Sequence, residues 1–308
     1  MNETLVMGLG PVGRAVMEAL VARGDRLRVA QRSQPKELPT GVGFTPCDVL
    51  DCEAVRRAIE GASQLVLAIG FPYDGKLWRT AWPAAMRNVV AAAEAAGTRV
   101  VFVDDMYMLG PQDAPLTEDM PLTDQGVKPA VRAEVTRIWQ AAAAAGRLKL
   151  AALRCPDFYG PGVGLSHIGD AGFGRLAQGK PAFLIAPPDM PHDFAYVPDI
   201  ARAVLSLLDA PDDVYGQAWN MPCAPTRTPR EILALGAAAL GVAPKVRALP
   251  LAVLPLLGLA VPMLREIAEM RFLFDRPYRV DARKFAARFW SDVTPFEVGA
   301  PAAARSFR

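Results

Sequence analysis

Short apolar runs alternate with amphipathic segments through the first half of the chain. Apolar residues at strand spacing predict strands, and those at helical spacing predict helices. The expected strands are 3–9, 26–31, 42–46, 64–69, 99–103 and 148–154, and the expected helices are 12–23, 51–60, 76–96 and 130–145. This alternation predicts an α/β fold, a doubly wound parallel sheet with helices on both faces.

The pattern loosens after residue 155 into segments rich in proline and glycine. We expect helices over 169–178 and 197–209, a strand over 218–221 that returns to the main sheet, and mostly helical structure from 222 onward. The alanine-rich stretches 91–96 and 141–145 favour helix. They suit a homodimer face as well as packing within one subunit.

The first expected strand runs into three closely spaced glycines and then into a helix. Gly8 suits a tight turn, Gly10 lets backbone amides approach a pyrophosphate, and Gly13 lets the helix pack closely on its strand. Pro11 and Val12 begin the helix, whose positive dipole end then faces the phosphates. The sequence therefore predicts a Rossmann dinucleotide site, although glycine-rich turns also serve as plain strand-to-helix connections.

The residues after the second strand indicate which dinucleotide is bound. A site selective for NAD places Asp or Glu there, where the carboxylate accepts hydrogen bonds from the ribose 2′-hydroxyl. Here the position holds Arg32 followed by Ser33, which suit a 2′-phosphate. NADP is thus favoured over NAD, the alternative being an ordinary solvated arginine.

Ligands of such sheets bind beyond the carboxyl ends of the strands. Besides the glycines and Arg32, we therefore expect cofactor contacts from residues that follow the third and fourth strands. These residues are Asp48, Val49, Ile69 and Gly70.

The amino-acid composition limits which kinds of ligand and partner are expected. The 308 residues include 34 basic and 32 acidic side chains, a near balance that gives no electrostatic reason to bind nucleic acid. The four cysteines lack a C-x-x-C pair and only two histidines are present, so we expect no metal and no disulfide. No signal-peptide pattern opens the chain, and we expect a cytoplasmic protein.

One stretch resembles a membrane segment. Residues 248–264 carry no charge, but they are short for a span and are interrupted by three prolines and a glycine. We expect a buried or groove-lining helical segment and no membrane partner.

Several segments together carry a family resemblance. They are Cys-Asp-Val-Leu-Asp at 47–51, Leu-Arg-Cys-Pro-Asp-Phe-Tyr-Gly-Pro-Gly at 153–162, His-Asp-Phe-Ala-Tyr-Val-Pro-Asp-Ile-Ala at 192–201, and Gly-Gln-Ala-Trp-Asn-Met at 216–221. In this order the chain resembles the extended or atypical short-chain dehydrogenases/reductases, which include the NAD-dependent epimerases and dehydratases. The resemblance implies that Asp48 contacts the adenine and that the substrate is a small carbonyl or hydroxyl compound. It also implies a Rossmann core, here 1–155 and 192–221, with a small substrate domain, here 156–191 and 222–308.

The chain departs from this family at its catalytic positions. Active members carry a Tyr-x-x-x-Lys pair, in which the lysine lowers the pKa of the tyrosine, and no such pair occurs here. Asp105 takes the position of the family's Ser or Thr. Aligned on the basic residue, Lys128 and Arg132 take the Tyr and Lys positions; aligned on Glu134, Gly126 and Ala130 take them. One interpretation makes Arg132 a ribose or phosphate ligand and Lys128 a partner of Asp105 or a donor to substrate, and the other makes both a solvated basic helix start.

The candidate acid/base residues are therefore Tyr107, Lys128, Asp105 and Tyr159, with Tyr107 and Lys128 the favoured proton donors. Two hypotheses follow. The chain is an NADP-dependent oxidoreductase or epimerase with replacement catalytic groups, which we favour, or a non-catalytic NADP-binding regulatory or interaction protein.

Overall fold

The computed structural model describes residues 3–308, which form two compact units. Unit 1 contains the residues up to Met108, Leu122–Arg154 and Ile200–Trp219. Unit 2 contains Leu109–Pro121, Cys155–Asp199 and Asn220–Arg308. Compared with the domains expected from the sequence, 109–121, 155, 192–199 and 220–221 group with the second unit.

Unit 1 is built on a seven-stranded sheet of order β10-β6-β5-β4-β1-β2-β3. Its strands are β1 (Thr4–Met7), β2 (Leu27–Gln31), β3 (Gly43–Pro46), β4 (Gln64–Leu67), β5 (Arg99–Asp104), β6 (Leu150–Arg154) and β10 (Gln217–Asn220). The neighbours from β3 to β6 in this order pair in parallel. The strand order reverses between β1 and β4, and such a reversal marks the ligand crevice of a doubly wound sheet. The predicted fold class is thus confirmed.

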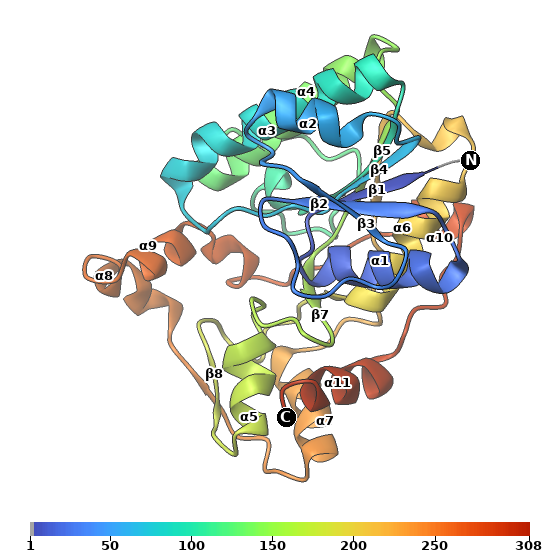
Figure 1. The fold of residues 1–308 in the computed structure, drawn as a ribbon. Helices are drawn as coiled ribbons and strands as arrows, with labels where there is room; N and C mark the ends of the chain where they lie inside the picture. The colour runs from blue at the N-terminus through green and yellow to red at the C-terminus, as the bar shows by residue number, and fades with distance from the viewer. Residues whose placement is uncertain (1–2) are drawn as a thin grey trace. The chain divides into compact units, whose positions relative to one another are not determined.

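Helices cover both faces of this sheet. They are α1 (Pro11–Arg23), α2 (Cys52–Ile59), α3 (Gly75–Ala96), α4 (Val127–Ala144) and α6 (Val197–Asp209), with short 3₁₀ turns at Tyr107–Leu109 and Asp212–Val214. Figure 1 shows α2, α3 and α4 over one face and α1 and α6 over the other. The strands are apolar on both sides because both sides are covered: Leu5 and Leu65 point to one face, Val6 and Val66 point to the other, and all four are fully buried.

Unit 2 packs helices around two small pairs of strands. The strands are β7 (Asp157–Tyr159), which pairs with β9 (Phe194–Tyr196), and β8 (Ala182–Leu184), which pairs with β11 (Val246–Ala248). The helices are α5 (Arg175–Ala177), α7 (Pro229–Leu240), α8 (Leu254–Leu257), α9 (Pro262–Glu269), α10 (Arg283–Arg288) and α11 (Phe296–Arg305), with a π-helical stretch at Gly169–Gly174 and 3₁₀ turns at Leu251–Val253 and Arg271–Leu273. Tyr159, Phe173, Leu233 and Phe296 form its buried core.

Three expectations differ from the structure. The helix predicted over 130–145 begins at Val127, so Lys128 lies inside its first turn. The helix predicted over 169–178 is instead π-helical before α5. The expected burial of 248–264 is wrong: Leu256 is 70 % exposed and Leu259 is 85 % exposed. Within residues 3–308, no helix is both long enough and apolar enough to span a bilayer.

Candidate functional site

The glycines after β1 form a tight backbone cradle. Gly8 has φ +94°, and a Cβ on it would lie 2.5 Å from the Ala68 carbonyl oxygen. A Cβ on Gly13 would lie 1.9 Å from the carbonyl oxygen of Gly8. By contrast, a Cβ on Gly10 would meet nothing within 4 Å. Two glycines are therefore required by packing, whereas the third borders open space where a ligand can approach the backbone.

The first turn of α1 faces that open space without a side-chain cap. Gly10 is the N-cap residue and offers no side-chain acceptor, and Pro11 occupies the first helical position. The amides of the following turn thus have no capping side chain to accept their hydrogen bonds. An anion placed there would accept them and would also meet the positive end of the helix dipole.

Arg32 and Ser33 lie exposed directly after β2. The Gln31 side chain donates to the Ser33 carbonyl oxygen at 2.7 Å and so fixes the start of this loop. Among residues 3–308, no carboxylate forms an ion pair with Arg32. Its guanidinium is therefore available to a phosphate.

The other expected cofactor residues also follow strands of unit 1. Asp48 lies exposed after β3, and its Oδ1 accepts a hydrogen bond from the Leu50 amide at 3.0 Å. The Val49 carbonyl oxygen accepts a hydrogen bond from Asn88 Nδ2 at 3.0 Å. Ile69 and Gly70 follow β4, and a Cβ on Gly70 would meet nothing within 4 Å. Together with the glycine cradle, these residues fit a dinucleotide laid across the crevice between β1 and β4.

A buried ion cluster lies where β5 ends. Asp104, 3 % exposed, and Asp105 both pair with Arg132 of α4; the Nε atom of Arg132 lies 3.0 Å from Oδ2 of Asp105. The guanidinium also stacks over Trp82, with 4.0 Å between Cζ and the ring centroid. Arg132 is only 1 % exposed, so its interpretation as a solvated residue is wrong. The sequence did not assign a role to Trp82, although Trp78 and Trp82 are one helical turn apart and so share a face of α3.

Asp105 has an unusual environment for a carboxyl group. Burial raises its pKa to about 7, with Asp104 adding to the shift and Arg132 opposing it. Its Oδ1 accepts a hydrogen bond from the Tyr107 amide at 2.9 Å. Asp105 can therefore gain or lose a proton near neutral pH, and it fixes the backbone of the neighbouring tyrosine.

Aromatic side chains surround the two remaining candidates of unit 1. Tyr107 stacks on Trp78, with 6.4 Å between ring centroids and 16° between planes. Lys128 is fully buried, and its Nζ lies 4.7 Å from the ring centroid of Tyr73. The interpretation of Lys128 as a solvated residue is therefore also wrong. Two of the candidates, Asp105 and Tyr107, come directly after β5, and the other two, Lys128 and Arg132, lie in the first turns of α4. Their apolar surroundings strengthen the interactions between their charges.

Tyr159, the remaining candidate, belongs to the core of unit 2. Its side chain is 1 % exposed and packs against Tyr196 and Phe296. Burial raises the pKa of its hydroxyl far above the usual value, and the oxygen has no hydrogen-bond partner among residues 3–308. This environment favours a packing role for Tyr159.

The histidines also belong to unit 2. His192 is 2 % exposed, and its Nε2 lies 3.1 Å from Oδ2 of Asp157. Burial alone would raise the pKa of Asp157, but the contact with His192 outweighs it and lowers the pKa. His167 stacks on Phe274 at 4.7 Å between centroids. Among residues 3–308, no group of three His, Cys, Asp or Glu side chains is arranged to hold a metal ion, and all four cysteines are free thiols.

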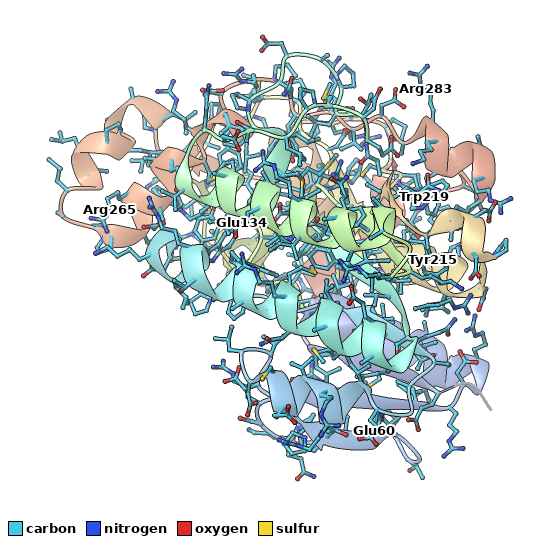
Figure 2. All side chains as sticks on the ribbon, turned by 90° about the horizontal axis from the view of Figure 1, so that it is seen from above. Glu60, Glu134, Tyr215, Trp219, Arg265 and Arg283 are labelled. Atoms are coloured by element: carbon cyan, nitrogen blue, oxygen red, sulfur yellow. The ribbon has the colours of Figure 1, made fainter. Side chains whose placement is uncertain are left out.

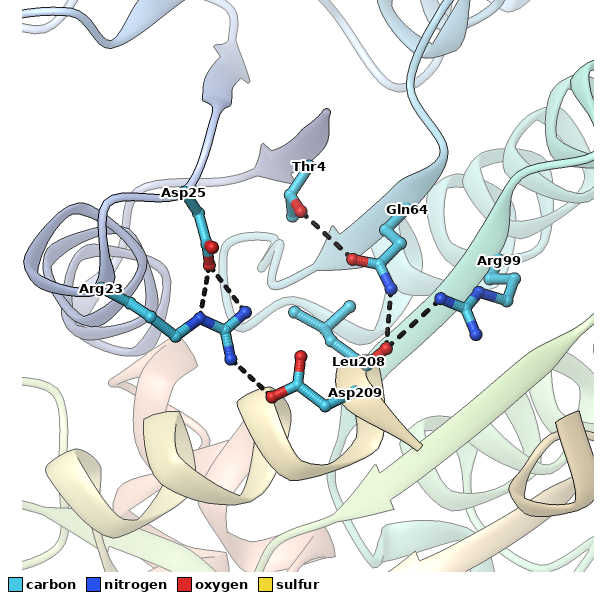
Figure 3. Close-up of a pocket in the computed structure, with 7 residues that line it drawn as sticks. All are labelled: Thr4, Arg23, Asp25, Gln64, Arg99, Leu208 and Asp209. Carbon is cyan, nitrogen blue, oxygen red and sulfur yellow. Dashed lines mark hydrogen bonds and ion pairs between the residues drawn. The ribbon is translucent and has the colours of Figure 1, made fainter. Parts of the chain in front are cut away.

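A polar pocket of unit 1 lies at the opposite edge of the sheet. Figure 3 shows its lining, which includes the first residues of three strands, Thr4, Gln64 and Arg99. Arg23 is already paired there with Asp25 and Asp209. Because the carboxyl ends of the strands carry the glycine cradle, this amino-end pocket is not the dinucleotide site.

Comparisons with known proteins agree with this architecture. A sequence model described as the NAD dependent epimerase/dehydratase family matches residues 4–221. A search of curated proteins finds no match.

Among solved structures, the enzyme WbmH of Bordetella bronchiseptica in complex with NAD+ is 19 % identical, with a TM-score of 0.78 and coverage of 100 % of this chain and 99 % of that one. The UDP-glucose 4-epimerase of Thermus thermophilus in complex with NAD is 22 % identical, with a TM-score of 0.77 and 99 % coverage of both chains. The UDP-glucose 4-epimerase of Thermotoga maritima with UDP-glucose is 16 % identical, with a TM-score of 0.80 and coverage of 99 % and 98 %. At these identities the structural likeness shows the fold alone. Because the family match spans more than half of the sequence, the chain belongs to the NAD-dependent epimerase/dehydratase family.

Proposed function

We propose that this chain is an oxidoreductase or epimerase that uses NADP and acts on a small hydroxyl or carbonyl compound. The observation that carries the proposal is the glycine cradle, in which Gly8 and Gly13 are fixed by packing while Gly10 borders open space. The pyrophosphate would lie against the first turn of α1, contacting the backbone of Gly10, Pro11, Val12 and Gly13.

Arg32 and Ser33 supply the preference for NADP. Both side chains are exposed after β2, where an acidic residue would select NAD. A guanidinium and a hydroxyl can both donate hydrogen bonds to a 2′-phosphate, and the charge of Arg32 strengthens that contact. The structural neighbours that hold NAD, WbmH and the Thermus thermophilus epimerase among them, are different proteins, and their cofactor does not decide the choice for a chain with arginine at this position.

In this proposal the two units bind different ligands. Unit 1 carries all the proposed cofactor contacts, including Asp48 and Val49 beside the adenine and Ile69 and Gly70 after β4. Unit 2 is the proposed substrate-binding domain. The Thermotoga maritima neighbour holds a sugar nucleotide, and a substrate of that general kind, a small molecule with hydroxyl groups, is consistent with the family.

Bound in the cradle, the nicotinamide supplies a hydride acceptor or donor. A hydroxyl substrate that loses a hydride must also lose its hydroxyl proton, so a side chain has to accept that proton and return it in the reverse direction. Tyr107 and Lys128 are the proposed donors, because a phenol or an ammonium can protonate a developing alkoxide. Asp105 is a third proton-holding group, since its pKa is about 7.

Arg132 is proposed to position these groups. Its ion pairs with Asp104 and Asp105 fix the carboxylate that in turn holds the Tyr107 amide. A contact from Arg132 to the cofactor ribose stays a prediction. Tyr159 is assigned to packing in unit 2, because its hydroxyl is sealed within the core.

Turnover tests this proposal. We expect purified protein to consume NADPH with an aldehyde or ketone of a substrate panel, to form NADPH from NADP+ with an alcohol, or to interconvert epimers of a nucleotide sugar. Absorbance follows the first two reactions, and chromatography of the sugars follows epimerisation, in which the cofactor undergoes no net change. Tyr107→Phe and Lys128→Met should each lower kcat by roughly 100-fold if those groups transfer the proton. Tyr215→Phe is the matched control: this tyrosine donates to the Leu207 carbonyl oxygen and contacts Arg99 at the far edge of unit 1, so its removal should leave kcat unchanged.

The missing Tyr-x-x-x-Lys pair favours a second candidate function, a non-catalytic NADP-binding regulatory or interaction protein. In that case the cradle binds NADPH tightly, but no member of the panel is turned over. Unchanged kcat in both the Tyr107→Phe and the Lys128→Met variants would instead refute only the assignment of the proton donors.

A further inference from the structure

An apolar helical hairpin extends from unit 2 with its side chains in solvent. It runs from the 3₁₀ turn at Leu251–Val253 through α8 to α9, and Figure 1 shows α8 and α9 next to each other. No charged residue occurs between 248 and 264. The most exposed large side chains are Leu259 at 85 %, Leu256 at 70 % and Met263 at 52 %. Contiguous apolar surface of this kind usually marks a site of interaction.

The hairpin is a folded element with fixed ends. Before it, β11 pairs with β8, and the Leu249 amide donates to the Leu184 carbonyl oxygen at 2.8 Å. After it, Met270 and Leu273 are buried. Within the hairpin, a Cβ on Gly258 would lie 3.0 Å from the Cα of Arg265, so the two helices pack closely at the turn. The exposed apolar turn is thus anchored before it by the pairing of β11 with β8 and after it by buried side chains.

Cations flank the tip on both sides of the apolar run. Lys245, Arg247 and Arg265 are exposed, and Figure 2 labels Arg265 on the hairpin. No carboxylate among residues 3–308 forms an ion pair with any of the three. Other exposed arginines of unit 2 include paired ones, as Arg230 is with Asp189 and Arg283 with Asp281, and unpaired ones such as Arg305. The positive charge beside the tip is therefore available to a negatively charged partner.

Apolar side chains at the tip, with unpaired cations before and after them in the chain, match the two layers of a lipid surface. The apolar groups can enter the boundary between headgroups and acyl chains, while the cations remain at the level of anionic headgroups. A second copy of the chain fits less well, because an isologous contact brings the same cations from both subunits together. The hairpin is too short to span a bilayer, so such binding would be peripheral.

We propose that the α8–α9 hairpin is a peripheral membrane anchor that binds surfaces rich in anionic lipid. The proposal departs from the expectation of no membrane partner, which rested on the short length of residues 248–264 and on the prolines and glycine that interrupt them. The anchor is independent of the proposed cofactor chemistry, since every residue it uses belongs to unit 2.

Vesicle sedimentation tests the anchor directly. The full chain is mixed with vesicles of phosphatidylcholine alone or of phosphatidylcholine with phosphatidylglycerol, and the bound fraction is measured. We expect binding to the anionic vesicles and little to the neutral ones. The double variant Leu256→Glu/Leu259→Glu should weaken binding by roughly tenfold or more, because two apolar contacts are lost and two like charges are added.

Leu165→Glu is the matched control. Leu165 is 99 % exposed in unit 2 but lies outside the hairpin, so this variant should bind vesicles like the unmodified chain. Arg247→Glu/Arg265→Glu should weaken binding by roughly fivefold or more per cation and should reduce its salt dependence. Unchanged melting temperatures and NADPH affinities in all variants would show that the fold and the cradle are intact.

Three outcomes would overturn the proposal. The unmodified chain could fail to bind anionic vesicles, or the Leu256→Glu/Leu259→Glu variant could bind them as well as the Leu165→Glu control. Alternatively, light scattering could show a dimer without lipid that the hairpin variant abolishes, which would assign the tip to a second copy of the chain.

Discussion

The glycine cradle of unit 1 and the apolar hairpin of unit 2 differ in how far local sequence determines structure. In the cradle, Gly13 is constrained by an atom five residues away, because the carbonyl oxygen of Gly8 occupies the space that a side chain would need; Gly8 itself is limited by Ala68, which follows the neighbouring strand β4. In the hairpin, the exposure of Leu256 and Leu259 depends on which distant elements fail to cover them. A backbone requirement can thus be predicted from spacing, whereas the burial of an apolar run requires tertiary structure.

The two units also differ in how their ion pairs are buried, and breaking the buried pairs of unit 1 should have the largest effect on stability. Arg132→Met leaves the buried Asp104 and the partly buried Asp105 without their cation, which should lower the free energy of unfolding by about 3–5 kcal/mol. Arg283→Met removes an exposed pair with Asp281 in unit 2 and should cost about 0–1 kcal/mol. Urea unfolding of both variants measures the difference. Similar losses in the two would mean that the cluster at β5 is not sealed from water.

Substitutions at two glycines of the cradle, Gly13 and Gly10, should affect different properties because only Gly13 is tightly packed. Gly13→Ala places a methyl group against the Gly8 carbonyl oxygen and should destabilise unit 1 by about 1–3 kcal/mol or more. Gly10→Ala adds its methyl group to open space, so the melting temperature should be unchanged while NADPH affinity falls. Thermal unfolding without ligand, followed by NADPH titration, checks both. Normal NADPH affinity in the Gly10→Ala variant would refute the assignment of the pyrophosphate to this position.

The two units should respond to pH in opposite senses. Burial, with His192 adding to it, lowers the pKa of His167 in unit 2 to about 4, so the unfolded chain binds its proton first and stability falls as the pH drops from about 6.5 toward 4. Burial raises the pKa of Asp105 in unit 1 to about 7, so the native state keeps that proton longer and stability falls as the pH rises from about 4 to 7.

Variants separate the two contributions. Relative to the unmodified chain, His167→Gln should remove the loss of stability on the acidic side, and Asp105→Asn should remove the loss on approach to neutrality. Denaturant unfolding at several pH values between about 4 and 8 provides the slopes. Identical slopes in the unmodified chain and both variants would contradict the burial of these groups.

Much of unit 1 could be predicted from its sequence because buried parallel strands and amphipathic helices have distinct periods. The short strands β7, β8, β9 and β11 were missed, since each has three residues and pairs with a strand far away in the sequence. The burial of Lys128 and Arg132 could not be predicted from the sequence either. Two basic residues one turn apart look solvated until the aspartates at the end of β5 and the aromatic face of α3 are placed beside them.

Calorimetric titration with NADPH and NADH tests the central claim, that the cradle and Arg32 together hold NADP. We predict that NADPH binds more tightly than NADH, and that Arg32→Ala weakens the binding of NADPH by about 1–3 kcal/mol while hardly changing that of NADH. Arg26→Ala is a suitable control, because Arg26 is an exposed arginine that precedes β2 and lies at its other end. Equal affinities for the two dinucleotides in the unmodified chain, or an equal loss for both in Arg32→Ala, would contradict it.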